Sequence, residues 1–229
     1  MDVTIVIPTK NAGRLFEKVL KKVFAQETTY EYEVICVDSG SSDNTIEIIK
    51  KFKENGTVIS FDINYRASLW DEDTARETVT KVFPYVDILF VSEETSRRML
   101  QKTGTLEEIM KSYCDDYGWK VVATTRREVI SPKIHNFSSK IYYDGKFYEE
   151  EPYMNIEVVD RVGSGDAYLA GALYGMITYD DMQRAVEYGN AMSAVKNTVL
   201  GDMAVSSLSE IDSIIASHKA TGHQDEMNR

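Results

Sequence analysis

The chain has 229 residues, of which 43% are hydrophobic, and this length and composition suit one sizeable α/β domain with a single core. Its formal net charge of −11 at pH 7 argues against unspecific binding to nucleic acids or anionic membranes, because their phosphates would be repelled. No apolar run is long enough to cross a membrane, and Met1 leads into a predicted strand without a signal peptide, so we expect a cytoplasmic protein with neither partner.

Strands and helices alternate along the first half of the chain. Apolar runs near Val3 and Glu33 predict strands, and amphipathic helices are expected over 13–26 and 44–53. Further strands are expected near Val58, Asp87 and Lys120. This alternation predicts a three-layer, Rossmann-like α/β fold with a mostly parallel sheet and helices on both faces. The prediction is a single domain over 1–215, followed by a flexible polar tail over 216–229.

Several polar segments have structural rather than chemical interpretations. Asp71, Glu72 and Asp73 precede a predicted helix over 74–83, so they are expected to supply its cap and first turn rather than a metal site. A polar loop is expected over 125–140. Asp144 and Gly145 lie between two apolar runs and predict a hairpin with a type I′ turn. Three helices are expected at the C-terminal end. The histidines lack zinc-ligand spacing, and Cys36 and Cys114 are not expected to form a disulfide.

One glycine-rich loop carries the strongest chemical signal. Gly163, Ser164 and Gly165 precede a helix expected over 167–176, so their amides could bind a phosphate or a developing oxyanion at the helix N-terminus. Asp166 would stand beside these amides, where a carboxylate could accept a proton from a hydroxyl that attacks ATP. The alternative is a loop that ends in a capping Asp. Small residues at spacings of three and four along the helix predict a close packing partner.

From about residue 56 to 215 the chain resembles the C-terminal half of the ribokinase-type (PfkB) carbohydrate kinases, in particular the 2-keto-3-deoxygluconate kinases. The resemblance rests on Asn64-Tyr65-Arg66, on the segment from Asp160 to Asp166, and on Ala194-Val195-Lys196 with Gly201-Asp202. Three motifs in the expected order are far more specific than one. The resemblance implies a ribokinase-like fold and transfer of the ATP γ-phosphoryl group to an acidic keto sugar.

The resemblance also implies roles for single residues. Asp166 would be the catalytic base, with Gly163, Ser164 and Gly165 as the anion hole. Arg66, with Asn64, would bind the carboxylate of the sugar, for which a planar, permanently charged guanidinium is suited. Asp160 would belong to a site that binds a monovalent cation, K⁺, or braces the loop. If the resemblance is set aside, an exposed surface residue is an equally good interpretation of Arg66, and Asp160 can be interpreted as a residue that caps the turn.

Nucleotide and magnesium contacts are also expected from the fold and the family. Thr124 and Thr125 follow an apolar run, and the carboxyl ends of such strands bind ligands in open α/β sheets. Asn190 matches a position that the family places near the adenine; the alternative is an Asn that is exposed on a helix or hydrogen-bonded locally. Mg²⁺ is expected with ATP, but the chain reads Ser92-Glu93-Glu94-Thr95 where these kinases often carry Asn-x-x-Glu. Glu93 and Glu94 are therefore the candidates for a substitute.

The first fifty residues resemble a different family. Pro8-Thr9-Lys10-Asn11 and the strand that ends in Asp38 are similar to the start of family-2 glycosyltransferases, in which that Asp contacts the nucleotide of an activated sugar. The alternative is a generic Rossmann-like unit. Residues 1–52 are therefore expected to be a βαβ opening, joined to the kinase-like part over 56–215, that adds two strands to the edge of the kinase sheet.

Three functions follow from this reading. The first is an ATP-dependent sugar kinase with a small-molecule partner, impaired if the N-terminal half of the kinase is absent. The second is a catalytically inactive remnant that binds nucleotide, and the third is a nucleotide-sugar-binding glycosyltransferase fragment. Assembly into a homo-oligomer stays open.

Overall fold

The structure is a computed structural model that describes residues 3–9, 11–29, 32–38, 41, 43–54 and 58–221. The chain divides into two compact units, Met1–Ala123 and Thr124–Arg229. The single domain expected over 1–215 stays a prediction. Within the described ranges, no helix combines the length and the apolar character needed to span a membrane.

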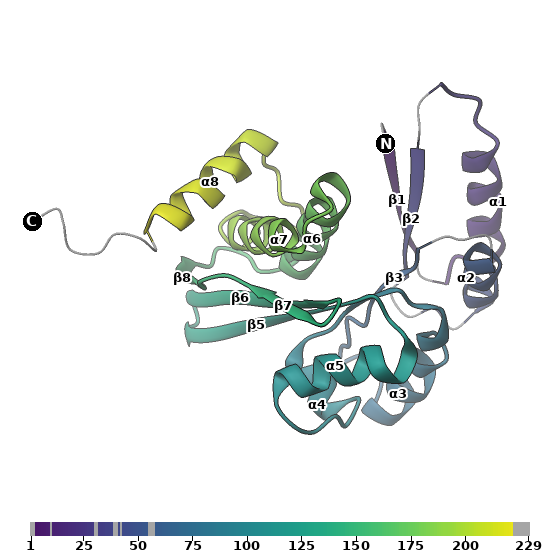
Figure 1. The fold of residues 1–229 in the computed structure, drawn as a ribbon, viewed down its shortest axis with the longest axis horizontal. Helices are drawn as coiled ribbons and strands as arrows, with labels where there is room; N and C mark the ends of the chain where they lie inside the picture. Colours follow the sequence, from purple (N-terminus) through teal and green to yellow (C-terminus); the bar gives the residue numbers. More distant parts are fainter. Residues whose placement is uncertain are drawn as a thin grey trace, which may run out of the picture. The chain divides into compact units, whose positions relative to one another are not determined.

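The first unit is built on a parallel sheet (Figure 1). Its strands are hydrogen-bonded in the order β1, β2, β3, β4 and the start of β5, and each pair is parallel. The mostly parallel α/β class predicted from the alternation is confirmed. The elements of this unit are β1 (Val3–Thr9), α1 (Gly13–Phe24), β2 (Tyr32–Asp38), α2 (Thr45–Glu54), β3 (Ser60–Asp62), α3 (Glu72–Thr80), a 3-10 turn (Phe83–Tyr85), β4 (Ile88–Phe90), α4 (Glu93–Arg98), α5 (Leu106–Tyr117) and β5 (Val121–Ser131).

The opening strand–helix–strand unit shares a core with the segment that follows it. Phe16 and Leu20 of α1 and Ile48 of α2 form one buried cluster with Ile59, which precedes β3. Strand β2 also pairs with β3 through Val37 and Asp38. The prediction that the opening adds two strands to the edge of the sheet is therefore confirmed. The side chains of Asp38 and Cys36 lie outside the described residues.

Local hydrogen bonds set the helix boundaries in this unit. Asp71 caps α3, because its carboxylate accepts a hydrogen bond of 2.8 Å from the Thr74 amide. The capping interpretation of the Asp71-Glu72-Asp73 triplet is thus confirmed for Asp71. Helix α5 begins with a capping box between Thr105 and Glu108. Cys114 on α5 is a free thiol whose pKa is raised by burial to about 11.

The second unit combines the rest of β5, three further strands and three helices (Figure 1). Strand β6 (Ile134–Tyr143) pairs antiparallel with β7 (Lys146–Glu149) and with β8 (Tyr153–Glu157). The hairpin predicted at Asp144-Gly145 is confirmed, since both residues have the positive φ (47° and 76°) that a type I′ turn requires. The helices are α6 (Ser164–Tyr179), α7 (Met182–Asn197) and α8 (Leu208–Thr221).

Helices α6 and α7 form the tightest pair of elements in the second unit (Figure 1). A Cβ at Gly171 would overlap the carbonyl oxygen of Tyr188, and a Cβ at Gly175 would lie 2.6 Å from the Cα of Ala185. The small residues of α6 therefore allow α7 to approach its backbone, and the close packing partner predicted for this helix is α7.

Two expectations for this unit are corrected. The polar loop expected over 125–140 is wrong, because β5 runs to Ser131 and β6 begins at Ile134. His135, expected in that loop, lies in β6 with 6% of its surface exposed, and burial is the main cause of its lowered pKa. Helix α8 also continues to Thr221, into the segment expected to be a flexible tail, and residues 222–229 lie outside the described residues.

Candidate active site

The glycine-rich loop lies at the N-terminus of α6. The helix begins at Ser164, with Gly163 as its N-cap, so it starts three positions before the residue expected from the sequence. Asp166 therefore lies in the first turn. Its side chain is exposed and makes no hydrogen bond or ion pair within the described residues. An unengaged carboxylate at this end of a helix is available to accept a proton from a bound hydroxyl.

Gly163 is required at its position by both conformation and space. Its φ of 79° is left-handed, a region that favours glycine. An added Cβ would also overlap the carbonyl oxygen of Asp202, in the turn that follows α7. The loop and this turn therefore lie against each other through their backbones, and Gly163 is the residue that allows it.

The amides available to an anion differ slightly from the predicted set. The Ser164 amide already donates to the Arg161 carbonyl at 3.1 Å, whereas the Ala167 amide makes the first helical bond, to Gly163 at 2.9 Å. The first-turn amides of Gly165 and Asp166 have no carbonyl partner within the helix. The amides of this loop that have no partner among the described residues, and so remain available to an anion, are therefore those of Gly163, Gly165 and Asp166, with the positive end of the helix dipole behind them.

Asp160 fixes the start of this loop. Its Oδ1 accepts from the Val162 amide at 3.0 Å, and its Oδ2 accepts from the Gly201 amide at 3.1 Å. The Val162 amide is the largest cause of a lowered pKa at Asp160, followed by the Gly201 amide and the charge of Lys196. The loop-bracing alternative thus describes the contacts that Asp160 makes in the structure.

Lys196, on α7, is a residue of this site to which the sequence analysis gave no role. Its Nζ donates to the carbonyl oxygens of Asp160 at 3.0 Å and Val199 at 3.2 Å. The side chain is fully buried, with 0% of its surface exposed. No local pattern in the sequence distinguishes this lysine from one that points into solvent.

Asn64 and Arg66 lie in the first unit, directly after the carboxyl end of β3. The Asn64 amide donates to Asp62 Oδ1 at 3.2 Å, and the Tyr65 hydroxyl donates to the Trp70 carbonyl at 3.2 Å. Arg66 is exposed, and its side chain has no hydrogen bond or ion pair with any described residue. The guanidinium is therefore available to an anionic ligand, and its role in binding a sugar carboxylate stays a prediction.

The predicted nucleotide contacts come from two elements of the second unit, β5 for Thr124 and Thr125 and α7 for Asn190. The sequence predicted that Thr124 and Thr125 follow the end of a strand. This prediction is wrong, because β5 continues past them to Ser131. Thr124 is 3% exposed, and its hydroxyl has no partner within the described residues. Asn190 is fully buried and donates to Glu150 at 2.8 Å. Burial raises the pKa of Glu150, and this hydrogen bond partly offsets that effect. Their nucleotide roles stay predictions.

The acidic residues proposed for magnesium are engaged in other contacts. Glu93 pairs with Arg97 at 2.7 Å and Glu94 with Arg98 at 2.8 Å, both along α4, whose cap is Ser92. The described part of the chain contains no group of three acidic, His or Cys side chains that could hold a metal ion. A magnesium ion here would therefore take most of its ligands from nucleotide phosphates and water.

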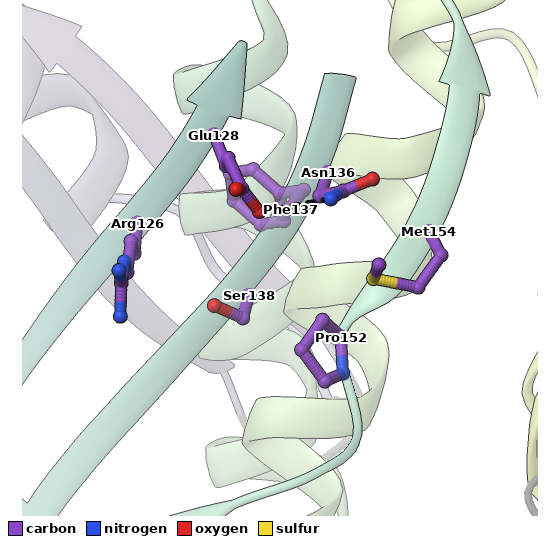
Figure 2. Close-up of a pocket in the computed structure, with 7 residues that line it drawn as sticks. All are labelled: Arg126, Glu128, Asn136, Phe137, Ser138, Pro152 and Met154. Atoms are coloured by element: carbon purple, nitrogen blue, oxygen red, sulfur yellow. Dashed lines mark hydrogen bonds between the residues drawn. The ribbon is translucent and has the colours of Figure 1, made fainter. Parts of the chain in front are cut away.

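A pocket of about 220 Å³ lies elsewhere in the second unit (Figure 2). Figure 2 shows Glu128 of β5 hydrogen-bonded to Asn136 of β6, a contact of 2.9 Å. The pocket is lined by Arg126, Glu128, Asn136, Phe137, Ser138, Pro152 and Met154. None of these is a predicted site residue, and the contact between Glu128 and Asn136 satisfies two of its polar groups internally.

Comparison with known proteins identifies the family. The model of the pfkB family carbohydrate kinases matches residues 2–208. The 2-dehydro-3-deoxygalactonokinase of Haloferax volcanii is 31% identical over 173 residues, which are 76% of this chain and 52% of that protein. The 2-dehydro-3-deoxygluconokinase of Thermotoga maritima has a similar fold, with a TM-score of 0.74 and 24% identity over 94% of this chain and 84% of that one. A structure described as E. coli ribokinase II, in complex with ATP and Mg²⁺, has a TM-score of 0.67 and 28% identity over 80% of this chain and 58% of that one.

The family match includes the opening segment. The match to the pfkB family begins at residue 2 of this chain. The comparisons therefore lend no support to the resemblance between residues 1–52 and glycosyltransferases. The chain spans about half the length of the curated relatives that it matches, 52% of the Haloferax protein and 45% of a 5-dehydro-2-deoxygluconokinase of Clostridium perfringens. The sequence motifs, the loop at α6 and the match over most of the chain agree: this chain belongs to the pfkB family of carbohydrate kinases.

Proposed function

We propose that this chain transfers the γ-phosphoryl group of ATP to a hydroxyl of an acidic keto sugar such as 2-keto-3-deoxygluconate. The observation that carries the proposal is the Gly163-capped N-terminus of α6, with Asp166 in its first turn. The name of the Haloferax relative supports a deoxy keto-sugar acid as the substrate class. The unengaged guanidinium of Arg66 supports a carboxylate on that substrate.

In the proposed reaction the Asp166 carboxylate accepts the proton of the sugar hydroxyl. The hydroxyl oxygen attacks the γ-phosphorus of ATP, the bond between the β–γ bridging oxygen and the γ-phosphorus breaks, and ADP leaves. The amides of Gly165 and Asp166 donate to the phosphoryl oxygens, and the helix dipole stabilises their charge. In such reactions positioning and electrostatics provide most of the rate enhancement.

The site fits a nucleoside triphosphate for two reasons. The loop leaves amides unpaired at a helix N-terminus, and glycines at 163 and 165 place no side chain beside them. Magnesium would enter with the nucleotide and neutralise phosphate charge when bound. Thr124, Thr125 and Asn190 are the proposed nucleotide contacts, and Asn64 is a second proposed sugar contact. A cytoplasmic location accompanies this small-molecule chemistry as part of the proposal.

The test is ATP consumption with 2-keto-3-deoxygluconate, its galactonate epimer and neutral sugars, for the wild type and Asp166→Asn. Loss of the base should lower kcat by about 10²–10⁴-fold without loss of folding. Asp180→Asn is the matched control, since Asp180 ends the same helix with a φ of 49°, a conformation that Asn tolerates. It should retain wild-type turnover.

Each other outcome would contradict the kinase proposal in a distinct way. Equal rates in the wild type and Asp166→Asn would exclude Asp166 as the base. ATP binding without turnover on any of the sugars would indicate the inactive nucleotide-binding remnant. Binding of a nucleotide sugar that is lost in Asp38→Ala would indicate the glycosyltransferase alternative.

A further inference from the structure

A fully buried positive charge lies beside the proposed phosphoryl-transfer loop. The Lys196 side chain has 0% of its surface exposed, and its ammonium group contacts the carbonyl oxygens of Asp160 and Val199 at 3.0 and 3.2 Å. Lysine is almost never fully buried without a partner, because removing its charge from water is costly. No carboxylate of the described residues forms an ion pair with this ammonium, which is stabilised by the two backbone carbonyls and, at longer range, by the charge of the Asp160 carboxylate.

The two carbonyls belong to the two segments that shape the loop. Asp160 opens the segment that leads to Asp166, and Val199 opens the turn that contains Gly201 and Asp202. The Asp160 carboxylate joins these segments through the Gly201 amide at 3.1 Å. The backbone of Gly163 also lies directly against the Asp202 carbonyl. The Lys196 ammonium therefore binds a carbonyl from each segment, and it holds together the loop and the turn that position the proposed anion site.

The same contacts bear on the potassium ion expected at Asp160. A monovalent cation in a protein is held by a cluster of backbone carbonyl oxygens. Here the Asp160 carbonyl already accepts a hydrogen bond from the Lys196 ammonium. This group carries the same single positive charge as a potassium ion and has three hydrogen-bond donors. A second cation on that carbonyl would be repelled by the ammonium group a few ångströms away. The residues present therefore do not fit an added potassium ion at the Asp160 carbonyl.

We propose that the Lys196 ammonium is the resident cation of this loop and that phosphoryl transfer by this chain needs no added monovalent ion. This inference rests on the proposed kinase function. Lys196 is thus a positioning residue, which acts through the Asp160 loop on the amides that receive the phosphate. The purely structural alternative is a lysine that caps the C-terminal carbonyls of α7.

The first experiment compares wild-type kinase rates in K⁺, Na⁺ and choline chloride at equal ionic strength and fixed magnesium. The expected result is rates within about twofold of one another, because the cation is part of the chain. A rate that rises tenfold or more in K⁺ would overturn the proposal.

The second experiment removes the charge in two ways. Lys196→Ala leaves space near the carbonyls, whereas Lys196→Met fills it without charge. Both should lower kcat, and K⁺ or methylammonium should restore it at least tenfold in Lys196→Ala only. Lys111→Ala, which removes an exposed partner of Asp115, is the control and should not respond to either ion. A lysine that only caps α7 would give equal losses that no cation restores, and that result would overturn the proposal.

A third measurement does not depend on activity. The Tm of Lys196→Ala should rise with K⁺ relative to choline, since an ion that binds only the folded state stabilises it, whereas the wild-type Tm should not change. If the wild type phosphorylates none of the sugars in any salt, the proposed function fails and the Tm comparison still decides the cation proposal. If Lys196→Ala does not fold in any salt, a wild-type Tm that rises with K⁺ overturns the proposal, and one that is constant supports it.

Discussion

The two loops with predicted chemistry are held in very different ways. The loop from Asp160 to Asp166 is fixed by the buried Lys196, by two hydrogen bonds to the Asp160 carboxylate and by backbone contact with the turn after α7. The loop that carries Asn64 and Arg66 is held by local hydrogen bonds, and Arg66 itself is exposed and unpaired among the described residues.

The difference matches the demands of the two proposed tasks. Positioning a base and an anion site tolerates little error, because displacement of about 1 Å can cost roughly 10²-fold in rate. Binding a carboxylate needs an accessible guanidinium, whose long side chain can adjust to the ligand. Substitutions of the residues that brace the first loop should therefore affect both folding and turnover, whereas substitutions at Arg66 should affect substrate binding alone.

The largest effect is expected for Gly163→Ala. A Cβ there would overlap the Asp202 carbonyl and impose a left-handed φ on alanine, which by itself costs about 1–3 kcal/mol. Kinase activity should fall below detection, and the free energy of unfolding, measured by urea titration, should decrease by at least this amount. A stable and active Gly163→Ala would show that the loop is not braced as described.

Gly165→Ala is the matched control for this prediction. No atom lies within 4 Å of a Cβ at Gly165, so the folded state should keep its stability, and alanine favours the helix. The methyl group would nevertheless stand beside the proposed phosphate. We therefore expect activity to fall while the unfolding free energy is retained, a combination that separates the anion site from its support.

Arg66→Ala tests the proposed role of the second loop, which carries Asn64 and Arg66, in binding the sugar carboxylate. Loss of a charge-assisted hydrogen bond should raise KM for an acidic keto sugar by about 10–100-fold and leave the Tm unchanged, because the side chain is exposed. KM for ATP should not change. Steady-state kinetics with the acid and with a neutral sugar alcohol measure the effect on each substrate.

Arg66→Lys provides the control for geometry. Lysine keeps the charge but not the planar pair of donors, so a bidentate contact predicts partial loss, between the wild type and Arg66→Ala. Equal KM values for the acid in all three proteins would remove Arg66 from the sugar site.

The sequence was sufficient for features that depend on local pattern. The glycine-rich string predicted a helix N-terminus at Asp166, and Asp144-Gly145 predicted the hairpin, because each requires residue types with particular backbone conformations. The spacing of small residues predicted close packing on α6, although it could not identify α7 as the partner. Such signals are contained within a few neighbouring residues.

Features that depend on contacts between distant segments could not be predicted. The carbonyl partners of Lys196 come from positions on either side of α7, and no local pattern specifies a lysine that points inward. The same is true of the hydrogen bond between Asn190 and Glu150. The extension of β5 past Thr125 was missed because the residues that continue the strand, Arg126 to Glu128, are charged and exposed.

The smallest effect is expected at Asp160, as a change in the dependence of stability on pH. The amides of Val162 and Gly201 and the charge of Lys196 lower its pKa below the ordinary 3.8. A carboxyl group whose pKa is lowered by folding contributes stability that is present above its unfolded value and lost as pH falls through its folded value. Asp160→Asn should thus lower the Tm by a few degrees at pH 7, and this difference should shrink below about pH 3.8.

Asp115→Asn, which removes an exposed pair with Lys111, should give a Tm profile close to the wild type. A difference at Asp160 that is independent of pH would indicate that the carboxylate charge does not brace the loop.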